Sequence, residues 1–287
     1  MNETQKKETR SGSLRLQNMH LGSHLIFCLW ALVVLFPIYI MLINSFKDRL
    51  SIYANPFGLP TTWHWSNYTD VLSSGDFIMY FFNSLIAVLV SLFLVVFLGT
   101  MLSYALANWI GKMSSFLYFL CIAGMMMPIK IASIKLLEMM RNLNLLNSIW
   151  ALVLVYTAMG IPISVFILTE FIREIPKELT EAALMDGVGR FNILIRIIMP
   201  LVRPAIATVA IYNLVPFWND LWFPLIFISD EKSKTLLLGV TRLFGQYQTD
   251  WSKVMAVLTL ASLPVLILYL LMSRQFIKGM TAGAVKG

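Results

Sequence analysis

The charged stretch Glu178–Pro200, ELTEAALMDGVGRFNILIRIIMP, has the residue types best suited to holding a soluble partner. Its charged side chains are Glu178, Glu181, Asp186, Arg190 and Arg196, in a chain that is 58% hydrophobic and only 13% charged. The two alanines after Glu181 present almost no side chain, so another protein can approach closely while the charges set the register. An amphipathic helix on a membrane surface, or an ordinary loop, fits the same spacing.

A second group of side chains is a candidate solute pathway. Asn213, Trp218, Asn219 and Asp220 fall within one apolar segment, and polar residues inside membrane spans often mark such pathways. Weaker candidates of the same kind are Asn83, Tyr156 and Glu170, although Glu170 can simply pair with Arg173. The alternative role is structural, with Asp220 holding its segment against the neighbouring segments.

Several kinds of chemistry are not expected of this chain. No phosphate-binding Gly-x-x-x-x-Gly-Lys-Ser/Thr loop occurs, and the GKMS sequence at Gly111–Ser114 lacks the earlier glycine. The three histidines and two cysteines show no metal-ligand spacing, and no nucleophile–base pair is recognisable. The net charge of +7 includes no basic cluster with interleaved aromatics, so nucleic acid is not an expected partner. We therefore expect a non-enzyme that binds no metal or cofactor itself.

A soluble protein with so few charged residues could not cover this much apolar surface. Membrane-spanning helices are therefore expected to position the candidate groups. About 20 apolar residues span a bilayer, and helices leave no backbone group unpaired in lipid. We predict an all-α integral membrane protein with six spans, the third surfacing near Pro128. The predicted spans are 24–46, 80–106, 114–134, 148–170, 204–228 and 254–274.

The Lys and Arg residues of the flanking segments predict the orientation. They are more numerous on the side of the N-terminus, and four of them, Lys6, Lys7, Arg10 and Arg15, precede the first span. Both termini are therefore predicted to be cytoplasmic. The predicted parts are an N-terminal segment 1–23, one transmembrane domain 24–274 and a C-terminal tail 275–287.

The insert between the fourth and fifth predicted spans, about 171–203, then faces the cytoplasm. Pro176 suits the start of a helix, and Glu178 and Glu181 lie where the helix dipole favours negative charge. Gly187 can adopt the left-handed conformation that closes a helix. A second short helix, Asn192–Met199, would then end at Pro200. The sequence therefore predicts two short helices with a glycine between them.

This spacing resembles the EAA loop of ATP-binding cassette (ABC) importer permeases. The family pattern is Glu-Ala-Ala, three residues, Gly, nine residues, Ile, one residue, Leu and Pro. Here Glu181, Ala182, Ala183, Gly187 and Ile197 match, Pro200 closes the pattern, and Met199 replaces leucine, a volume-conserving change. The stretch FWNDLWFPLIF and the ending FIKGMTAGAVKG are similar to the carbohydrate-uptake branch, in particular to its shorter maltose-type permease subunit.

The resemblance implies a prokaryotic inner-membrane importer that works by alternating access. The chain would pair with a second permease subunit and meet two cytoplasmic ATPase subunits, which bind ATP and Mg, and an extracytoplasmic solute-binding protein. Glu181 would pair with a basic residue of the ATPase, Ala182 and Ala183 would form the close contact with Asp186 beside them, and Gly187 would make the bend. The tail Thr281–Gly287 would reach toward the ATPase dimer.

The implied solute is a mono- or oligosaccharide. Amides and carboxylates such as Asn219 and Asp220 bind sugar hydroxyls, and Trp218 can pack against the apolar face of a sugar ring. Other interpretations remain open: a permease for a polyol, glycerol phosphate, phosphate or amino acid, or a membrane scaffold or enzyme that docks a soluble partner. A secondary transporter is disfavoured, because only Asp220 approaches an intramembrane carboxylate.

Overall fold

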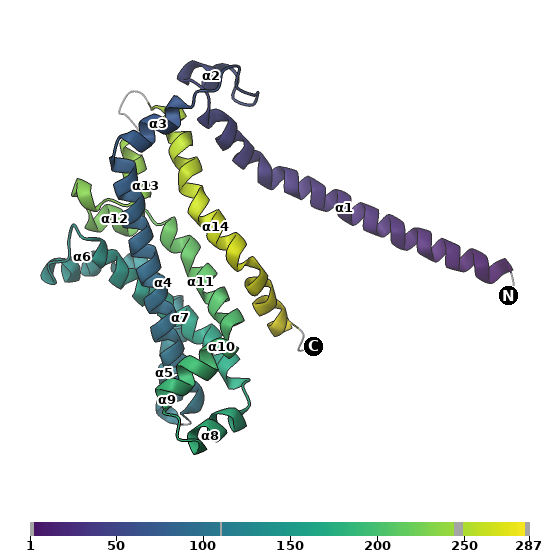
Figure 1. The fold of residues 1–287 in the computed structure, drawn as a ribbon, viewed down its shortest axis with the longest axis vertical. Helices are drawn as coiled ribbons and strands as arrows, with labels where there is room; N and C mark the ends of the chain where they lie inside the picture. The colour runs from purple at the N-terminus through teal and green to yellow at the C-terminus, as the bar shows by residue number, and fades with distance from the viewer. Residues whose placement is uncertain (1–2, 110, 244–248, 285–287) are drawn as a thin grey trace. The chain divides into compact units, whose positions relative to one another are not determined.

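The computed structural model describes the backbone of residues 3–109, 111–243 and 249–284, and side chains from Gly22 onward within these ranges except at 242, 272 and 274–284 (Figure 1). These residues form helices and no β-strand, as the sequence predicts. The longer helices are α1 (Glu3–Ser45), α4 (Asp76–Asn108), α5 (Lys112–Met126), α6 (Ser133–Asn142), α7 (Ile149–Arg173), α8 (Lys177–Met185), α11 (Arg203–Trp218) and α14 (Trp251–Ala284).

Short helical segments connect them. They are α2 (Arg49–Ala54), α3 (Ser66–Ser73), η1 (Ile129–Ala132), α9 (Arg190–Ile193), the π-helix η2 (Leu194–Ile198), α10 (Met199–Leu201), α12 (Trp222–Phe227), η3 (Glu231–Ser233), α13 (Leu236–Val240) and η4 (Thr241–Leu243).

Four helices are long and apolar enough to cross a membrane. They are Gly22–Ser45 of α1, all of α4 and α7, and Trp251–Leu271 of α14. Two bent pairs raise the number to six if each pair is one span: α5 with Ile129–Asn142, bent by 86°, and Arg190–Leu201 with α11, bent by 80°. The structure therefore has four to six candidate spans in the part it describes.

The fifth predicted span, 204–228, is not one helix. α11 ends at Trp218, and α12 begins only at Trp222. α11 continues through Pro216, so this proline does not cause the break. The break is stabilised by the carboxylate of Asp220, which accepts hydrogen bonds from the N–H groups of Trp222 and Phe223 and so provides the first turn of α12 with acceptors. The third predicted span does break near Pro128, since α5 ends at Met126.

The two ends of the chain extend the flanking helices. α1 already begins at Glu3, so most of the predicted N-terminal segment 1–23 is part of this helix. α14 continues through most of the predicted tail, to Ala284. Residues 1–2 and 285–287 lie outside the described residues.

The structure divides into two compact units. Unit 1 comprises residues 1–71 and 249–259, and unit 2 comprises residues 72–248 and 260–287. In unit 1, Phe46 packs edge-on against Trp63 and Trp65, and Asn67 donates hydrogen bonds of 2.9 Å to the carbonyls of Ser45 and Lys47. These contacts fold the segment after α1 back onto the end of that helix.

The core of unit 2 is α4 packed along α7, with α11 against both. Small residues allow this close approach, as is typical of membrane helices. A Cβ on Gly160 of α7 would lie 2.5 Å from Val95 of α4 and 2.9 Å from Asn213 of α11, and one on Gly99 would lie 2.7 Å from Ser164. In Figure 1, α8 and α9 lie at the end of unit 2 where α4 and α7 finish, and α12 and α13 lie toward the other end.

Candidate functional site

The charged insert folds into two short helices joined by a turn at Gly187. α8 follows Pro176 and ends where the N–H groups of Asp186 and Gly187 bond to the carbonyls of Ala182 and Leu184. Gly187 has a φ of 75°, the left-handed conformation that glycine adopts at least cost. α9 begins at Arg190, so the chain changes direction within the few residues between the two helices.

The surface of α8 is divided between an exposed and a buried face. Glu181, Ala182 and Met185 are exposed, with Met185 88% exposed. Ala183, by contrast, is only 8% exposed and faces the body of unit 2. The two alanines of the predicted contact therefore lie on different faces. Glu181 and Ala182 are available to a partner, whereas Ala183 packs α8 onto its own chain.

The return from α9 to α11 contains an unusual helical turn. Leu194–Ile198 forms a π-helix, a geometry that is rare and frequently found at functional sites. Ile193, Leu194 and Ile198 are buried, so they anchor this segment, while Pro200 is exposed in α10. The exposed turn around Asp186 is thus followed by a segment that is anchored by buried hydrophobic side chains.

A cavity of about 820 Å³ lies between the end of α4 and the insert. The side chains of Tyr104, Asn108 and Trp109 line it from α4, and those of Lys177, Glu181 and Arg190 line it from α8 and α9. A smaller cavity of about 170 Å³ beside it shares Asn108, Lys177 and Thr180 and adds Arg173. Neither cavity was expected from the sequence, because their walls come from segments about seventy residues apart along the chain.

One contact at the C-terminal end of α7 was predicted from the sequence. Arg173 forms a 2.8 Å ion pair with Glu170, the pairing expected from their spacing on one helix face. Tyr118 of α5 donates a 3.0 Å hydrogen bond to the same carboxylate, and the Arg173 guanidinium lies 5.1 Å from the centre of its ring. This cluster ties α5 to α7.

At the other end of α11, Asp220 and Tyr156 form a site of their own. The Tyr156 hydroxyl donates a 3.0 Å hydrogen bond to Oδ2 of Asp220, and its ring stacks on Phe217 at 4.9 Å between centroids. Asp220 also accepts the N–H groups of Trp222 and Phe223, at 3.1 and 3.2 Å. Both carboxylate oxygens therefore have protein partners.

The other predicted pathway residues are spread over unit 2. Asn213 is 4% exposed and donates to the carbonyl of Val209, and the buried Trp218 indole donates to the carbonyl of Ala261. Asn219 is exposed and lies beside Asp220 in the sequence. Asn83 of α4 donates to the carbonyls of Lys232 and Lys234. The structure thus joins Tyr156 to Asp220 and leaves Asn213 and Asn83 in separate surroundings.

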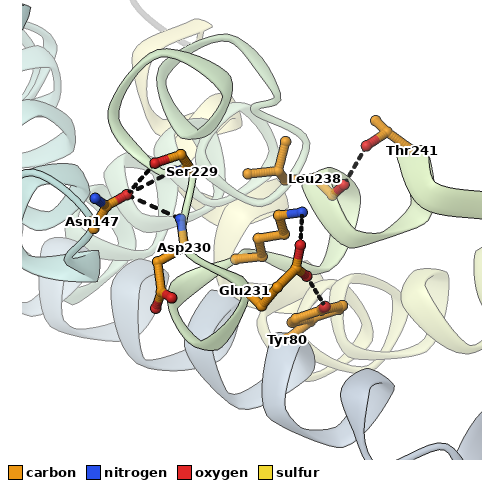
Figure 2. Close-up of polar contacts among 8 residues, drawn as sticks. Tyr80, Asn147, Ser229, Asp230, Glu231, Leu238 and Thr241 are labelled. Atoms are coloured by element: carbon orange, nitrogen blue, oxygen red, sulfur yellow. Dashed lines mark hydrogen bonds and ion pairs between the residues drawn. The ribbon is translucent and has the colours of Figure 1, made fainter.

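Figure 2 shows a polar network that sequence reasoning missed, around the loop after α12. Oδ1 of Asn147 accepts three hydrogen bonds, from the N–H and hydroxyl of Ser229 and the N–H of Asp230, at 2.7–3.0 Å. Asn147 has a φ of 58°, a left-handed conformation that Asn tolerates better than most residues. The Asn-rich sequence around Asn144 and Asn147 is a turn signal that could have identified it.

Tyr80 of α4 anchors the same loop from the other side. Its hydroxyl donates a 2.9 Å hydrogen bond to Oε2 of Glu231, and Lys234 pairs with Oε1 at 2.7 Å (Figure 2). Gly239 of α13 lies so close to the Tyr80 ring that any side chain there would collide with it. The loop is therefore held in one arrangement by α4 and by the turn before α7.

Comparisons with known proteins agree on one family. Residues 75–282 match the family described as "Binding-protein-dependent transport system inner membrane component". A putative ABC transporter permease of Caldicellulosiruptor sp. (strain Rt8B.4) is 39% identical, over 90% of this chain and 94% of that protein. A diacetylchitobiose uptake system permease of Streptomyces coelicolor is 31% identical, over 92% and 88%. A melibiose/raffinose/stachyose import permease of Bacillus subtilis is 32% identical, over 88% and 91%.

A solved structure shares the fold. A chain of a bacterial ABC transporter involved in the import of the acidic polysaccharide alginate superposes with a TM-score of 0.78. The superposition covers 91% of this chain and 97% of that chain, at 19% sequence identity.

Proposed function

The chain belongs to the family of binding-protein-dependent transport system inner membrane components, and from this premise we propose that it is one permease subunit of an ATP-driven sugar importer. Members of this family are transport components rather than enzymes. The chain would form half of the solute pathway, and a second, homologous permease subunit would form the other half. Six spans with both termini in the cytoplasm are part of the proposal.

The names of the relatives support a sugar as the solute. They include permeases for diacetylchitobiose, for melibiose, raffinose and stachyose, for arabinooligosaccharides and for starch degradation products. Each matches at least 87% of this chain. A mono- or oligosaccharide is therefore the proposed cargo, delivered by an extracytoplasmic solute-binding protein. A polyol, glycerol phosphate or amino acid is the alternative that a transport assay must separate from it.

The single observation that carries the coupling role is the exposed face of α8. Glu181, Ala182 and Met185 offer a short helix with one charge, one flat position and one long apolar side chain. We propose that this face docks on a cytoplasmic ATPase subunit, of which two copies bind ATP and Mg. Gly187 and the buried base of α9 would transmit movement of the docked helix to α11, and Asp186 and Pro200 lie on the exposed part of this connection.

We propose two different roles for the polar residues near Trp218, direct contact with the sugar and support of the pathway. Asn219 is exposed and is the better candidate for contact with a sugar, together with Trp222, which is 42% exposed. Asp220 and Tyr156 would shape the pathway by holding α12 against α7. Asn213 and Trp218 would act in the same indirect way because both are buried. Asn83 would do so because its amide donates to two backbone carbonyls, those of Lys232 and Lys234.

The test compares Glu181→Lys with Glu178→Lys in the complete importer. Both residues are exposed on α8, so the two variants change charge equally. We expect Glu181→Lys to insert in the membrane normally but to lose ATPase co-purification and sugar-stimulated ATP hydrolysis, whereas Glu178→Lys retains most of both. Equal ATPase recovery with Glu181→Lys would contradict the docking role. Stimulation by an amino acid or glycerol phosphate, and not by an oligosaccharide, would contradict the proposed cargo.

A further inference from the structure

The cavity at the end of α4 has a lining rich in hydrogen-bond donors. Lys177 and Arg190 reach it from the insert, and Tyr104 and Trp109 reach it from α4. An ammonium carries three N–H donors, a guanidinium five and an indole one, and none of these groups accepts. Neither Lys177 nor Arg190 pairs with a carboxylate among the residues that the structure describes. Such a lining fits a ligand with several acceptor oxygens, such as a phosphate.

The other polar groups that line the cavity indicate which kind of phosphate compound fits it. The amide of Asn108 uses one N–H for the carbonyl of Tyr104 at 2.8 Å, which leaves its second N–H to donate. Among the described residues that line the cavity, Glu181 is the one acidic residue, so the charges of Lys177, Arg190 and Glu181 sum to +1. A carboxylate there favours a phosphate whose substituent also carries hydroxyl donors, as a glycerol headgroup does.

An exposed apolar stripe along α4 leads to this cavity. Ile78, Phe82, Ile86, Leu89, Phe93 and Met101 are 38–65% exposed, and they follow one another at helical spacing. Ala105 and Asn108 continue the same face into the cavity. In an inner-membrane protein, such a stripe is in contact with acyl chains, and Trp and Lys or Arg gather where the chains meet the headgroups. The cavity therefore lies where a headgroup is expected.

We propose that this cavity binds the phosphate headgroup of an anionic phospholipid, with Lys177 and Arg190 as its cationic ligands. The acyl chains would lie along the stripe on α4. The inference rests on the membrane location of the family and on the cavity, and it does not require that α8 docks an ATPase. A bound lipid there would contact both α8 and the end of α4, because Lys177, Glu181 and Tyr104 line the same cavity.

The test measures phosphatidylglycerol binding to the complete importer by native mass spectrometry in detergent, with phosphatidylcholine as the neutral comparison. A basic residue near an anionic surface contributes about fivefold in affinity. The variant Lys177→Ala/Arg190→Ala is therefore expected to bind phosphatidylglycerol about thirtyfold more weakly. The matched control is Lys112→Ala/Arg196→Ala, which removes two exposed charges from the same end of unit 2 outside the cavity lining. It should bind as the unmodified protein does.

Further variants keep the result interpretable. Lys177→Arg/Arg190→Lys preserves the charge and should retain binding within about threefold, and each single alanine variant should lose about fivefold. Equal losses in the cavity and control variants would overturn the proposal, because they indicate only a general attraction to anionic lipid. Displacement of the lipid by millimolar inorganic phosphate would also overturn it, since the ligand would then be a solution anion.

The ATPase subunit supplies the last comparison. If adding ATPase releases phosphatidylglycerol in proportion to docking, the cavity is part of the ATPase interface and the lipid proposal is wrong. If the lipid stays bound, the proposal holds in the assembled importer. Co-purification of the ATPase with Glu181→Lys is measured separately, so failure of the docking proposal and failure of the lipid proposal give different results.

Discussion

The Tyr156 hydroxyl donates a hydrogen bond of 3.0 Å to Oδ2 of Asp220, joining the middle of α7 to the residue that supports the first turn of α12. Tyr156 is 2% exposed, so this bond forms away from bulk water. The local hydrogen bonds by which Asp220 stabilises the break after α11 are therefore supported by a contact between residues 64 positions apart in the chain.

We expect Tyr156→Phe to destabilise the protein by about 1–2 kcal/mol, because a buried hydrogen bond to a carboxylate is lost. Asp220→Ala should cost more, since it also leaves two N–H groups of α12 without their acceptor. Asp220→Asn retains acceptor capacity and should lie between the unmodified protein and Asp220→Ala. Thermal unfolding in detergent measures the order. Unchanged unfolding of Asp220→Ala with altered sugar stimulation would instead assign Asp220 a direct contact with the solute.

Gly187→Ala should weaken the turn between α8 and α9. At a φ of 75°, an L-residue with a Cβ costs about 1–2 kcal/mol, although no atom lies within 4 Å of the added Cβ. The control is Gly189→Ala, where φ is −64° and the surroundings are equally open. We expect Gly187→Ala to raise the number of ATP molecules hydrolysed per solute transported, because a weakened turn transmits movement less well, and Gly189→Ala to have little effect. Similar results for both variants would contradict a role for the left-handed conformation of Gly187, because the two sites are equally open.

Asn147→Gly should release the loop after α12. The substitution tolerates the φ of 58° at this position but removes the oxygen that accepts three hydrogen bonds. Hydrogen exchange at Ser229 and Asp230 should become about tenfold faster, as expected for the loss of hydrogen bonds worth about 1–1.5 kcal/mol, whereas Asn147→Asp, which keeps an acceptor, should change it little. Full protection in Asn147→Gly would contradict this role of the Asn147 side chain and leave the loop to its other contacts, such as Tyr80 with Glu231 and the Ser233 hydroxyl with the carbonyl of residue 147.

The buried Lys47 should make the stability of the segment around it in unit 1 depend on pH. Its side chain is 2% exposed and its ammonium donates a 2.7 Å hydrogen bond to the carbonyl of Asn55. Burial lowers the pKa of Lys47 below its ordinary value of 10.5. Between the lowered pKa and 10.5 the unfolded segment binds more protons than the folded one, so stability rises with pH over this interval.

The measurement is hydrogen exchange of residues 46–68, corrected for the intrinsic effect of pH. Protection should increase as the pH rises toward 10.5, and Lys47→Met should remove this increase. Lys130→Met is the control, because Lys130 is an exposed lysine of unit 2. Protection in the unmodified protein that falls over the same interval would contradict the assigned cause.

Local sequence was sufficient for much of this structure. Runs of about 20 apolar residues predict membrane helices, and four of them form single helices long and apolar enough to span. The Glu170–Arg173 pair followed from spacing on one helix. In each case the deciding interactions join residues that are close in the chain, which is why a pattern along the sequence can reveal them.

The rest was decided by contacts between distant segments. The apolar composition of 204–228 does not show that α11 stops at Trp218, because the carboxylate that supports α12 is held from α7. The alanines beside Glu181 look alike in the sequence, and only the packing of α8 buries Ala183 and exposes Ala182. The cavity between Trp109 and Arg190 is likewise a product of two segments meeting. Sequence by itself determined the helices and the short reversal at Gly187, since these depend on local hydrogen bonding and hydrophobicity. The tertiary structure decided which polar groups already have partners and which are free to bind, since that depends on where the helices pack.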